Sequence, residues 1–388
     1  MDSNKQVAIF TSSDLSTVQG STEGYYVASN LAEEYNLNII SRHDPEIAEA
    51  DYKSIPGPGP IPALLLYNLV LLPYFLYLCW RDQYDIIYTY KGFNIAPLFL
   101  ATATGARWIA DFPTKPTAQA KEWSNLSGGI GTLEWLYYSS LDLAYRLTLP
   151  HATAVVGLSK PLNDHLNEQF GVPQRKLYLV PLGVDSDHFR PDDLQEIPRE
   201  PFDIVYVGSI VSERNLGLCI DAIASENLEV DIRLHLVGDG PENELNELRQ
   251  IAKEAAVKEA ICWHGYIDHE KIPTVLDGMD VAISPLPAHD SYEVSSPAKL
   301  YEYLAMGLPI LCTDLRAHRN TLVEEQTGFF FEPGSLPSLV DGINRISELE
   351  SEEWLNIRQH AREAGKDNDW SSRIELIQKI IEKKMRNS

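Results

Sequence analysis

The chain has 388 residues, of which 44% are hydrophobic and 23% charged, and its formal net charge at pH 7 is −24. This charge excludes a protein that binds nucleic acid through bulk charge, because neutralising phosphates requires an excess of cations. The plentiful apolar residues exclude a disordered chain, and the 4 widely separated cysteines exclude a disulfide-stapled module and a cysteine metal site. The acidity is explained either by solubility or by adaptation to high salt.

We expect no targeting signal, because Met1–Gln6 is polar and the apolar run Val7–Phe10 is too short for the core of a signal peptide. The membrane candidate is Ala63–Trp80, whose 18 residues carry no formal charge. A spanning helix needs ~17–25 residues. Asn68 and Pro73 interrupt the segment, so we expect a helix that is buried or faces a membrane. The expected location is the cytoplasm, including the cytosolic face of a membrane.

Short apolar runs alternate with helical patterns along the whole chain. The runs lack polar alternation, as expected for strands that are covered on both faces of a parallel sheet. The strands expected from them are 7–10, 37–40, 85–88, 108–110, 154–158 and 177–180, followed by 204–207, 232–237, 261–263, 281–284, 310–312 and 329–331. Helices such as Gly24–Tyr35 and Glu242–Ala256 lie between them. This alternation predicts an α/β fold with doubly wound parallel sheets.

The length predicts more than one domain, since domains usually run to ~100–200 residues. Residues 186–201 hold three prolines and many charges without apolar periodicity, and a new strand follows directly. We therefore predict a Rossmann-like domain over 1–185, a linker over 186–201 and a second Rossmann-like domain over 202–369, facing each other across a cleft. Ligands of open α/β sheets bind beyond the carboxyl ends of the strands, so the loops there are the candidate site.

Two of these loops have the composition of an anion site. Thr11–Gly24 is rich in Gly, Ser and Thr and leads into a helix, so it offers N–H groups to an anion, or forms ordinary turns. In the second half, Gly208 permits close backbone approach after its strand. Arg214 lies near the start of the next helix, where its guanidinium either holds phosphate oxygens or forms a surface pair with Glu213.

The most informative stretch surrounds a predicted helix start. Ser295 and Ser296 precede a helix that Pro297 begins well, so hydroxyls and free N–H groups converge at its positive end. Lys299 adds a full charge in the first turn, where a cation is unfavourable unless an anion is held there. Glu302 follows on the same face. The pattern fits a nucleotide, with its diphosphate at the helix start and its ribose on Glu302, or a capped helix with a Lys–Glu pair.

An ordered set of motifs in the second half carries a resemblance to a known family. The motifs are Tyr206-Val207-Gly208, Glu213-Arg214-Asn215, Val237-Gly238-Asp239-Gly240-Pro241, Trp263-His264-Gly265-Tyr266, Ser296-Pro297-x-Lys299-Leu300-x-Glu302-Tyr303 and Gly307-x-Pro309, preceded by Pro181-Leu182-Gly183-Val184-Asp185. They are similar to those of the retaining GT-B glycosyltransferases of family 4, the group-1 type, over most of residues 150–385. Trp370 and the helix after it resemble the family's last helix, so the expected first domain includes 370–388.

The resemblance implies a metal-independent, retaining hexosyltransferase. Its substrates would be a UDP- or GDP-sugar and a lipid-linked or saccharide acceptor, in the assembly of a glycan or glycoconjugate. Gly238 and Gly240 lack the third glycine of a dinucleotide fingerprint, so we expect no nicotinamide and no cofactor beside the donor substrate. A UDP-sugar epimerase of the GT-B fold and a non-catalytic sugar-nucleotide-binding protein are the alternatives.

The resemblance also implies which residues bind the donor. They are Gly20, Gly208, Ser209, Arg214, Gly265, Tyr266, Ser295, Ser296, Pro297, Lys299, Leu300 and Glu302. Arg214, Lys299 and the turn 295–297 would hold the diphosphate, and Glu302 would hold the ribose. Gly20 would bring a loop of the first domain against the phosphates, and the backbone around Gly265 would face the base.

Four positions depart from the family pattern. Ser209 stands where the family usually has an Arg, and Arg214 stands where it usually has a Lys. Glu293 lies one residue away from the position that would complete an E-x7-E pair with Glu302, and a local bulge would let it serve. Asp111, in Asp-Phe-Pro, stands where the family has a His, and would either orient a substrate or cap a turn. Asp111 and Glu293 are therefore our candidate catalytic residues.

The apolar segment Ala63–Trp80 gains a role in this fold. It is apolar nearly all round, with tyrosines and a tryptophan suited to a membrane interface. The Pro- and Gly-rich run 56–60 before it would project it from the core. We therefore expect a peripheral membrane contact that brings the first domain to a lipid-linked acceptor, with weak attraction to anionic lipid because basic residues nearby are few.

Overall fold

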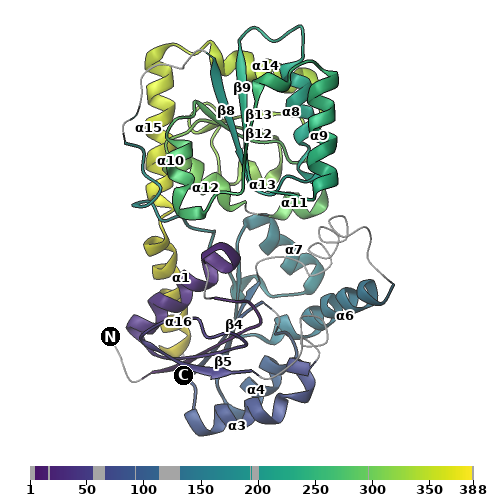
Figure 1. Cartoon of the computed structure of the whole chain (residues 1–388). Helices are drawn as coiled ribbons and strands as arrows, with labels where there is room; N and C mark the ends of the chain where they lie inside the picture. The colour runs from purple at the N-terminus through teal and green to yellow at the C-terminus, as the bar shows by residue number, and fades with distance from the viewer. Residues whose placement is uncertain are drawn as a thin grey trace. The chain divides into compact units, whose positions relative to one another are not determined.

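The computed structural model describes residues 5–15, 18–55, 66–91, 93–112, 132–192, 194, 201–295 and 297–386. These residues form two compact units. The first unit contains the described residues up to Pro181 and those from Ser371 onward, and the second unit runs from Leu182 to Trp370. Each unit is built on one parallel sheet with helices packed around it (Figure 1).

The sheet of the first unit has the strand order β3-β2-β1-β4-β5-β6-β7, and all its neighbours are parallel. Its strands are β1 (Gln6–Thr11), β2 (Asn36–Ser41), β3 (Ala50–Ser54), β4 (Ile86–Tyr90), β5 (Arg107–Phe112), β6 (Ala154–Gly157) and β7 (Leu177–Leu179). All but β3 coincide with apolar runs that predicted strands. The sequence of β3, ADYKS, is polar and largely solvent-facing, which suits the edge of a sheet and explains why it was missed.

The last helix of the described chain belongs to the first unit. The helices of this unit are α1 (Val18–Glu34), η1 (Leu66–Val70), α3 (Leu72–Asp82), α4 (Ala96–Thr104), α6 (Thr132–Thr148), η2 (Leu149–His151), α7 (Lys160–Phe170), η3 (Gln174–Lys176) and α16 (Trp370–Arg386). Ile377, Ile380 and Ile381 of α16 are buried in the same core as Val7 of β1 and Leu31 of α1. This return of the chain to the first unit is the feature that the resemblance implied.

The sheet of the second unit has the order β10-β9-β8-β11-β12-β13 and is also parallel. Its strands are β8 (Phe202–Val207), β9 (Ile232–Val237), β10 (Ile261–Gly265), β11 (Val281–Ser284), β12 (Ile310–Thr313) and β13 (Gly328–Phe331). The order reverses direction between β8 and β11. In such a sheet, ligands bind beyond the carboxyl ends of the strands that flank the reversal.

Two helices of the second unit pack unusually closely. Its helices are η4 (Ser212–Arg214), α8 (Leu216–Ile223), α9 (Glu242–Glu254), η5 (Lys258–Ala260), η6 (His269–Lys271), α10 (Ile272–Leu276), α11 (Asp290–Val294), α12 (Ala298–Ala305), α13 (Arg316–Arg319), α14 (Leu336–Ser347) and α15 (Ser351–Asp367). A Cβ added at Gly365 of α15 would lie 2.4 Å from Cα of Ala305 in α12. Nε of Arg358 donates to the carbonyl of Gly307 at 3.0 Å, just past the end of α12. The packing and this bond together fix the position of α12.

The loop predicted over Thr11–Gly24 is shorter in the structure. Helix α1 begins at Val18, so Gly20 lies in the first turn of a helix rather than in a loop. Thr11 Oγ1 accepts the N–H of Ser13 at 3.0 Å, which turns the chain directly after β1. The Gly- and Ser-rich composition that predicted a loop therefore belongs partly to a helix start.

The segment Ala63–Trp80 is not one continuous helix, in contrast to our expectation. Its described part consists of η1 and α3, which are separated at Leu71, and Pro73 lies in the first turn of α3, where a missing N–H is tolerated. Asn68 is buried, and its Oδ1 accepts the N–H groups of Asn94, Ile95 and Ala96 at 3.0–3.2 Å, at the start of α4. Asn68 thus interrupts the apolar run because it caps a neighbouring helix.

One face of this segment is core and another faces outward. The buried residues on α3 are Phe75, Leu78 and Cys79. The exposed apolar residues are Leu69, Val70, Tyr77 and Trp80, and 74% of the surface of Trp80 is accessible. Among the described residues, no helix is long and apolar enough to cross a membrane.

Candidate functional site

Bare backbone forms one wall of the candidate site, at the carboxyl ends of β8, β9 and β10. We call Gly208, Gly238, Gly240 and Gly265 the glycine shelf. A Cβ added at Gly238 would lie 1.9 Å from the carbonyl oxygen of Gly208, and Gly238 has φ +141°. A Cβ at Gly240 would lie 1.9 Å from the carbonyl oxygen of Ile210. The N–H of Gly238 donates to the carbonyl of Gly265 at 2.8 Å. The loops stack backbone on backbone at Gly238 and Gly240, so a side chain is excluded at these two positions.

Lys299 points to the edge of the glycine shelf. It lies in the first turn of α12, and its Nζ is 3.8 Å from the centroid of the Tyr206 ring. A Cβ added at Gly208 would lie 3.0 Å from this Nζ. The Tyr206 hydroxyl donates to the carbonyl of Ser209 at 3.0 Å, which fixes the ring under the ammonium group. The glycine at position 208 therefore leaves the space in which the Lys299 ammonium lies.

Glu302 lies on the same helix, and its carboxylate meets a histidine that sequence reasoning missed. Nε2 of His269 donates to Oε1 of Glu302 at 2.9 Å. This hydrogen bond raises the pKa of His269 above its ordinary value, against the opposing effect of burial. Next along α12, the hydroxyl of Tyr303 accepts the N–H of Val207 at 2.8 Å, which ties the helix to the end of β8. The structure thus holds both charged residues of α12 beside the carboxyl ends of the strands.

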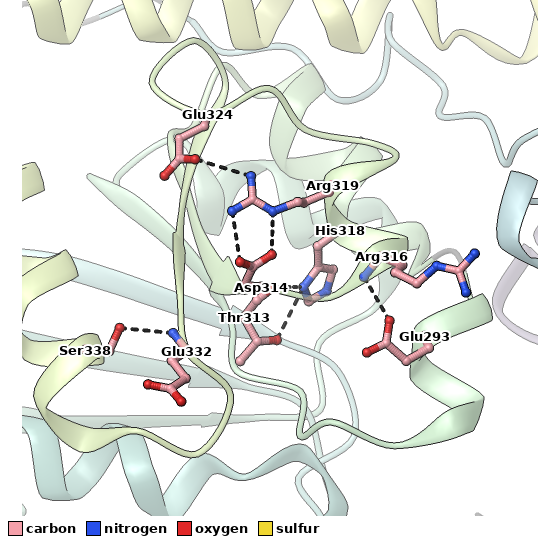
Figure 2. Close-up of polar contacts among 9 residues, drawn as sticks. All are labelled: Glu293, Thr313, Asp314, Arg316, His318, Arg319, Glu324, Glu332 and Ser338. Carbon is pink, nitrogen blue, oxygen red and sulfur yellow. Dashed lines mark hydrogen bonds and ion pairs between the residues drawn. The ribbon is translucent and has the colours of Figure 1, made fainter.

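Arg214 and Glu293 meet the short helix α11 in different ways. The half-buried guanidinium of Arg214 lies 5.4 Å from the centroid of the Tyr292 ring, in cation–π geometry. The neighbouring Glu293 accepts the N–H of Arg316 at 2.9 Å and so caps the start of α13 (Figure 2). The contact that the structure gives Glu293 is therefore with a helix start, and its catalytic role stays a prediction.

The remaining predicted donor residues differ in what they present. Ser295 donates to the carbonyl of Tyr292 at 3.2 Å, and Pro297 is the N-cap of α12. Leu300 is fully buried, so a contact with a ligand would have to use its main chain. Ser209 and Tyr266 are exposed. Ser296 lies outside the described residues.

A buried histidine that the sequence did not flag joins the ends of β11 and β12. Nδ1 of His318 donates to the carbonyl of Thr313 at 2.7 Å (Figure 2). Its Nε2 lies 3.3 Å from the hydroxyl of Ser284. Burial lowers the pKa of His318 to about 4, and the positive charge of Lys299 acts in the same direction. His318 is therefore neutral at pH 7. It stabilises the ends of the two strands without adding charge to the site.

In the first unit, Asp111 belongs to a buried cluster at the ends of β4 and β5. The Tyr88 hydroxyl donates to Oδ2 of Asp111, whereas Oδ1 has no hydrogen-bond partner among the described residues. Burial raises the pKa of Asp111 to about 7, while the Tyr88 hydrogen bond and Lys91 oppose the shift. Burial and then the charge of Asp111 raise the pKa of Glu23, on α1, well above its usual range. The alternative turn-capping role would involve Pro113, which lies outside the described residues.

Two family models match consecutive parts of the chain. The model described as "Glycosyl transferases group 1" matches residues 191–368, and the "Glycosyl transferase 4-like domain" matches residues 26–183. A 2-deoxystreptamine glucosyltransferase of Streptomyces kanamyceticus is 21% identical over 56% of this chain and 57% of its own length. A GDP-mannose-dependent alpha-(1-6)-phosphatidylinositol monomannoside mannosyltransferase of Mycobacterium tuberculosis is 25% identical over 45% of this chain and 47% of its own length. The chain thus spans about half the length of these curated relatives.

Solved structures match the fold over nearly the whole chain. The sucrose-phosphate synthase of Thermosynechococcus elongatus has a TM-score of 0.77 at 16% identity and covers 99% of this chain and 100% of its own. Anabaena HepE in complex with UDP has a TM-score of 0.74 at 14% identity and covers 98% of this chain and 100% of its own. The fold and the family models lead to the same assignment. The chain has two parallel-sheet units and a last helix that returns to the first unit, and both family models match it. The chain therefore resembles the group-1 glycosyltransferases in both of its halves and has the GT-B fold.

Proposed function

We propose that this protein is a hexosyltransferase that moves a sugar from a UDP- or GDP-sugar to a lipid-linked or saccharide acceptor, with retention of configuration, in glycan assembly. The observation that carries the proposal is the placement of Lys299 in the first turn of α12, against Gly208, with Glu302 further along the same helix. A cation beside bare backbone suits a diphosphate, and a carboxylate nearby suits ribose hydroxyls.

The chemistry that these residues supply is stabilisation of the leaving diphosphate. Negative charge grows on the diphosphate as the bond to the sugar breaks, so positive groups fixed beforehand lower the barrier. In our proposal, Lys299, Arg214 and the positive N-terminal end of α12 fill this role without a metal ion. The tyrosine rings under the two cations keep them in place before the donor binds.

The names of similar proteins support a hexose donor of this class. One relative is named a glucosyltransferase and another a GDP-mannose-dependent mannosyltransferase. Anabaena HepE has been solved with UDP and with UDP-glucose. The experiment described below determines which nucleotide, UDP or GDP, and which hexose the donor contains.

We propose that Asp111 orients a sugar hydroxyl of the acceptor or donor. A carboxyl group with a pKa of about 7 exists in both protonation states near neutral pH, so it can donate to a hydroxyl or accept from one. Its Oδ1 is buried and has no hydrogen-bond partner among the described residues, so in our proposal this atom makes the contact. The exposed apolar residues of η1 and α3 support our proposal of a membrane contact, which would suit a lipid-linked acceptor.

Lys299→Ala tests the proposal. Panels of UDP- and GDP-sugars are screened by thermal shift, and the dissociation constant is then measured by calorimetry. A charge-assisted hydrogen bond contributes ~1.5–3 kcal/mol, so we expect an affinity about 10- to 100-fold lower. Lys253→Ala, on an exposed position of α9, is the matched control and leaves affinity unchanged. Unaltered binding by Lys299→Ala would contradict the proposed site.

A second measurement separates the alternatives. Donor turnover is followed with and without saccharide or lipid acceptors. An epimerase would interconvert the sugar nucleotide without any acceptor, and a binding protein would show affinity but no turnover. Transfer that depends on the acceptor, with the anomeric configuration of the product retained, supports the proposed function.

A further inference from the structure

His269 contacts Glu302 from a loop that the sequence motifs did not include. It begins η6, three residues after Tyr266, and Nε2 lies 2.9 Å from Oε1 of Glu302. The imidazole also packs against Phe189, with ring centroids 5.1 Å apart. Phe189 is buried, and its carbonyl accepts a hydrogen bond from Arg362 at 2.8 Å. The histidine is therefore held from one side by fixed structure while its Nε2 faces the carboxylate.

We propose that His269 is a positioning residue for nucleotide binding, which holds the Glu302 carboxylate ready to accept hydrogen bonds from the hydroxyl groups of a ribose. This inference rests on the proposed function, because it takes Glu302 as the ribose ligand. The inference adds His269, which lies outside the sequence motifs, to the nucleotide site. In this proposal His269 affects nucleotide binding only by positioning Glu302.

The chemistry of the pair supports this task. An ionised carboxylate offers about four lone-pair sites on its two oxygens, and His269 occupies one of them. No other side-chain hydrogen bond to Glu302 is made by the described residues, so in our proposal the other sites serve the two hydroxyls of a ribose. The side chain of Glu302 keeps 16% of its surface exposed, so a ligand can reach it. Ordering a flexible Glu side chain is entropically unfavourable, and the contact with His269 already orders it before the nucleotide arrives.

The contact also connects two parts of the expected nucleotide site. Tyr266 and Gly265 belong to the loop that we expect to face the base, and His269 lies on the continuation of that loop. Through His269, the loop is joined to the helix that carries Lys299 and Glu302. A displacement of the loop would therefore shift the carboxylate expected to meet the ribose.

Several charged groups face the imidazole. Glu302 on α12, Asp185 before the second sheet and Glu270 on η6 itself favour the protonated ring, while burial opposes it. The ring of His188 is also near, with a centroid distance of 6.3 Å. The hydrogen bond to Glu302 joins opposite charges when His269 is protonated and weakens when the imidazole becomes neutral. Ribose recognition should therefore weaken as pH rises through the raised pKa of His269.

The test compares nucleotides with and without ribose hydroxyls. The probes are UDP, GDP and their 2′,3′-dideoxy counterparts, and the dissociation constants are measured by calorimetry for the full chain. We expect His269→Leu to bind the ribonucleotide about fivefold more weakly, the effect of roughly 1 kcal/mol from one hydrogen bond, and to bind the dideoxynucleotide as the wild type does. His269→Gln, which retains an N–H donor, should recover most of the loss. Lys271→Leu, exposed on the same short helix, is the matched control.

Each outcome decides between the possibilities. An equal loss for ribo- and dideoxynucleotides in His269→Leu would mean a merely structural role and would overturn the inference. Equal affinity of the wild type for ribonucleotides and dideoxynucleotides would show that Glu302 does not bind the ribose. This result would overturn the inference, while nucleotide binding itself would still be supported. Failure of the wild type to bind either UDP or GDP would instead overturn the proposed function. A ribose preference that falls with pH in the wild type but not in His269→Gln supports the inference.

Discussion

Replacing Asp111 by Asn should change how the stability of the first unit depends on pH. Asp111 is 5% exposed and accepts a hydrogen bond from Tyr88, which an amide oxygen can also accept. Asn has almost the same shape as Asp but does not titrate near neutral pH. The variant therefore removes one ionisation while leaving the packing nearly unchanged.

The expected magnitude follows from the pKa of Asp111, about 7 in the folded chain against 3.8 as its ordinary value. Between these values the folded chain holds more protons than the unfolded chain, so the free energy of unfolding falls as pH rises. The slope for one group is about 1.4 kcal/mol per pH unit, so from pH 5 to pH 7 the wild type should lose roughly 2–3 kcal/mol relative to Asp111→Asn. Protonation of Glu23 is coupled to that of Asp111, so Glu23 would account for part of this change in the free energy of unfolding.

The assay is urea-induced unfolding of both proteins at pH 5, 6, 7 and 8, with the transition of the first unit identified by hydrogen exchange in β4 and β5. Asp51→Asn, at an exposed position of β3, is the control and should keep the pH dependence of the wild type. Identical pH dependence of wild type and Asp111→Asn would refute the reasoning, because it would show that the proton affinity of Asp111 does not differ between folded and unfolded chains.

Two further substitutions test the glycine shelf and the apolar face of the first unit. Gly238→Ala should destabilise the second unit by ~2 kcal/mol or more and weaken nucleotide binding, since its Cβ would overlap the carbonyl oxygen of Gly208. Gly217→Ala, whose nearest new contact would be at 3.7 Å, should be tolerated in urea unfolding, and equal effects of the two changes would contradict this account. Trp80→Ser should reduce co-sedimentation with phosphatidylcholine vesicles without changing nucleotide affinity, and undiminished sedimentation would place any membrane contact elsewhere.

The sequence was sufficient to predict the strands that are buried on both faces, because Val, Ile and Leu runs have no other stable place in an α/β fold. It was insufficient for β3, whose side chains face solvent, and for the helical position of Gly20, where composition alone favoured a loop. The resemblance to the group-1 family correctly implied the GT-B fold and the returning helix α16. These features depend on patterns that extend along one stretch of chain.

The partners of the candidate site residues could not be predicted in the same way. His269 and Glu302 are 33 positions apart, and the loop geometry that brings them together leaves no periodic signal. Glu23 and Asp111 interact only because the N-terminal part of α1 lies near the end of β5 in the folded unit. The N–H of Arg316 donates to the carboxylate of Glu293, and this contact depends on the packing of α11 against α13.

The return of α16 has a consequence for the order in which the chain folds during synthesis. The described part of the second unit is continuous from Leu182 to Trp370, whereas the core of the first unit includes residues of α16. The chain enters the second unit at Leu182 and leaves it after Trp370. These two points lie close together, because the N–H of Trp370 donates to the carbonyl of Val184 at 3.1 Å. During synthesis, the second unit can therefore fold before the first unit is complete. The core of the first unit is completed only after the isoleucines of α16 have been translated.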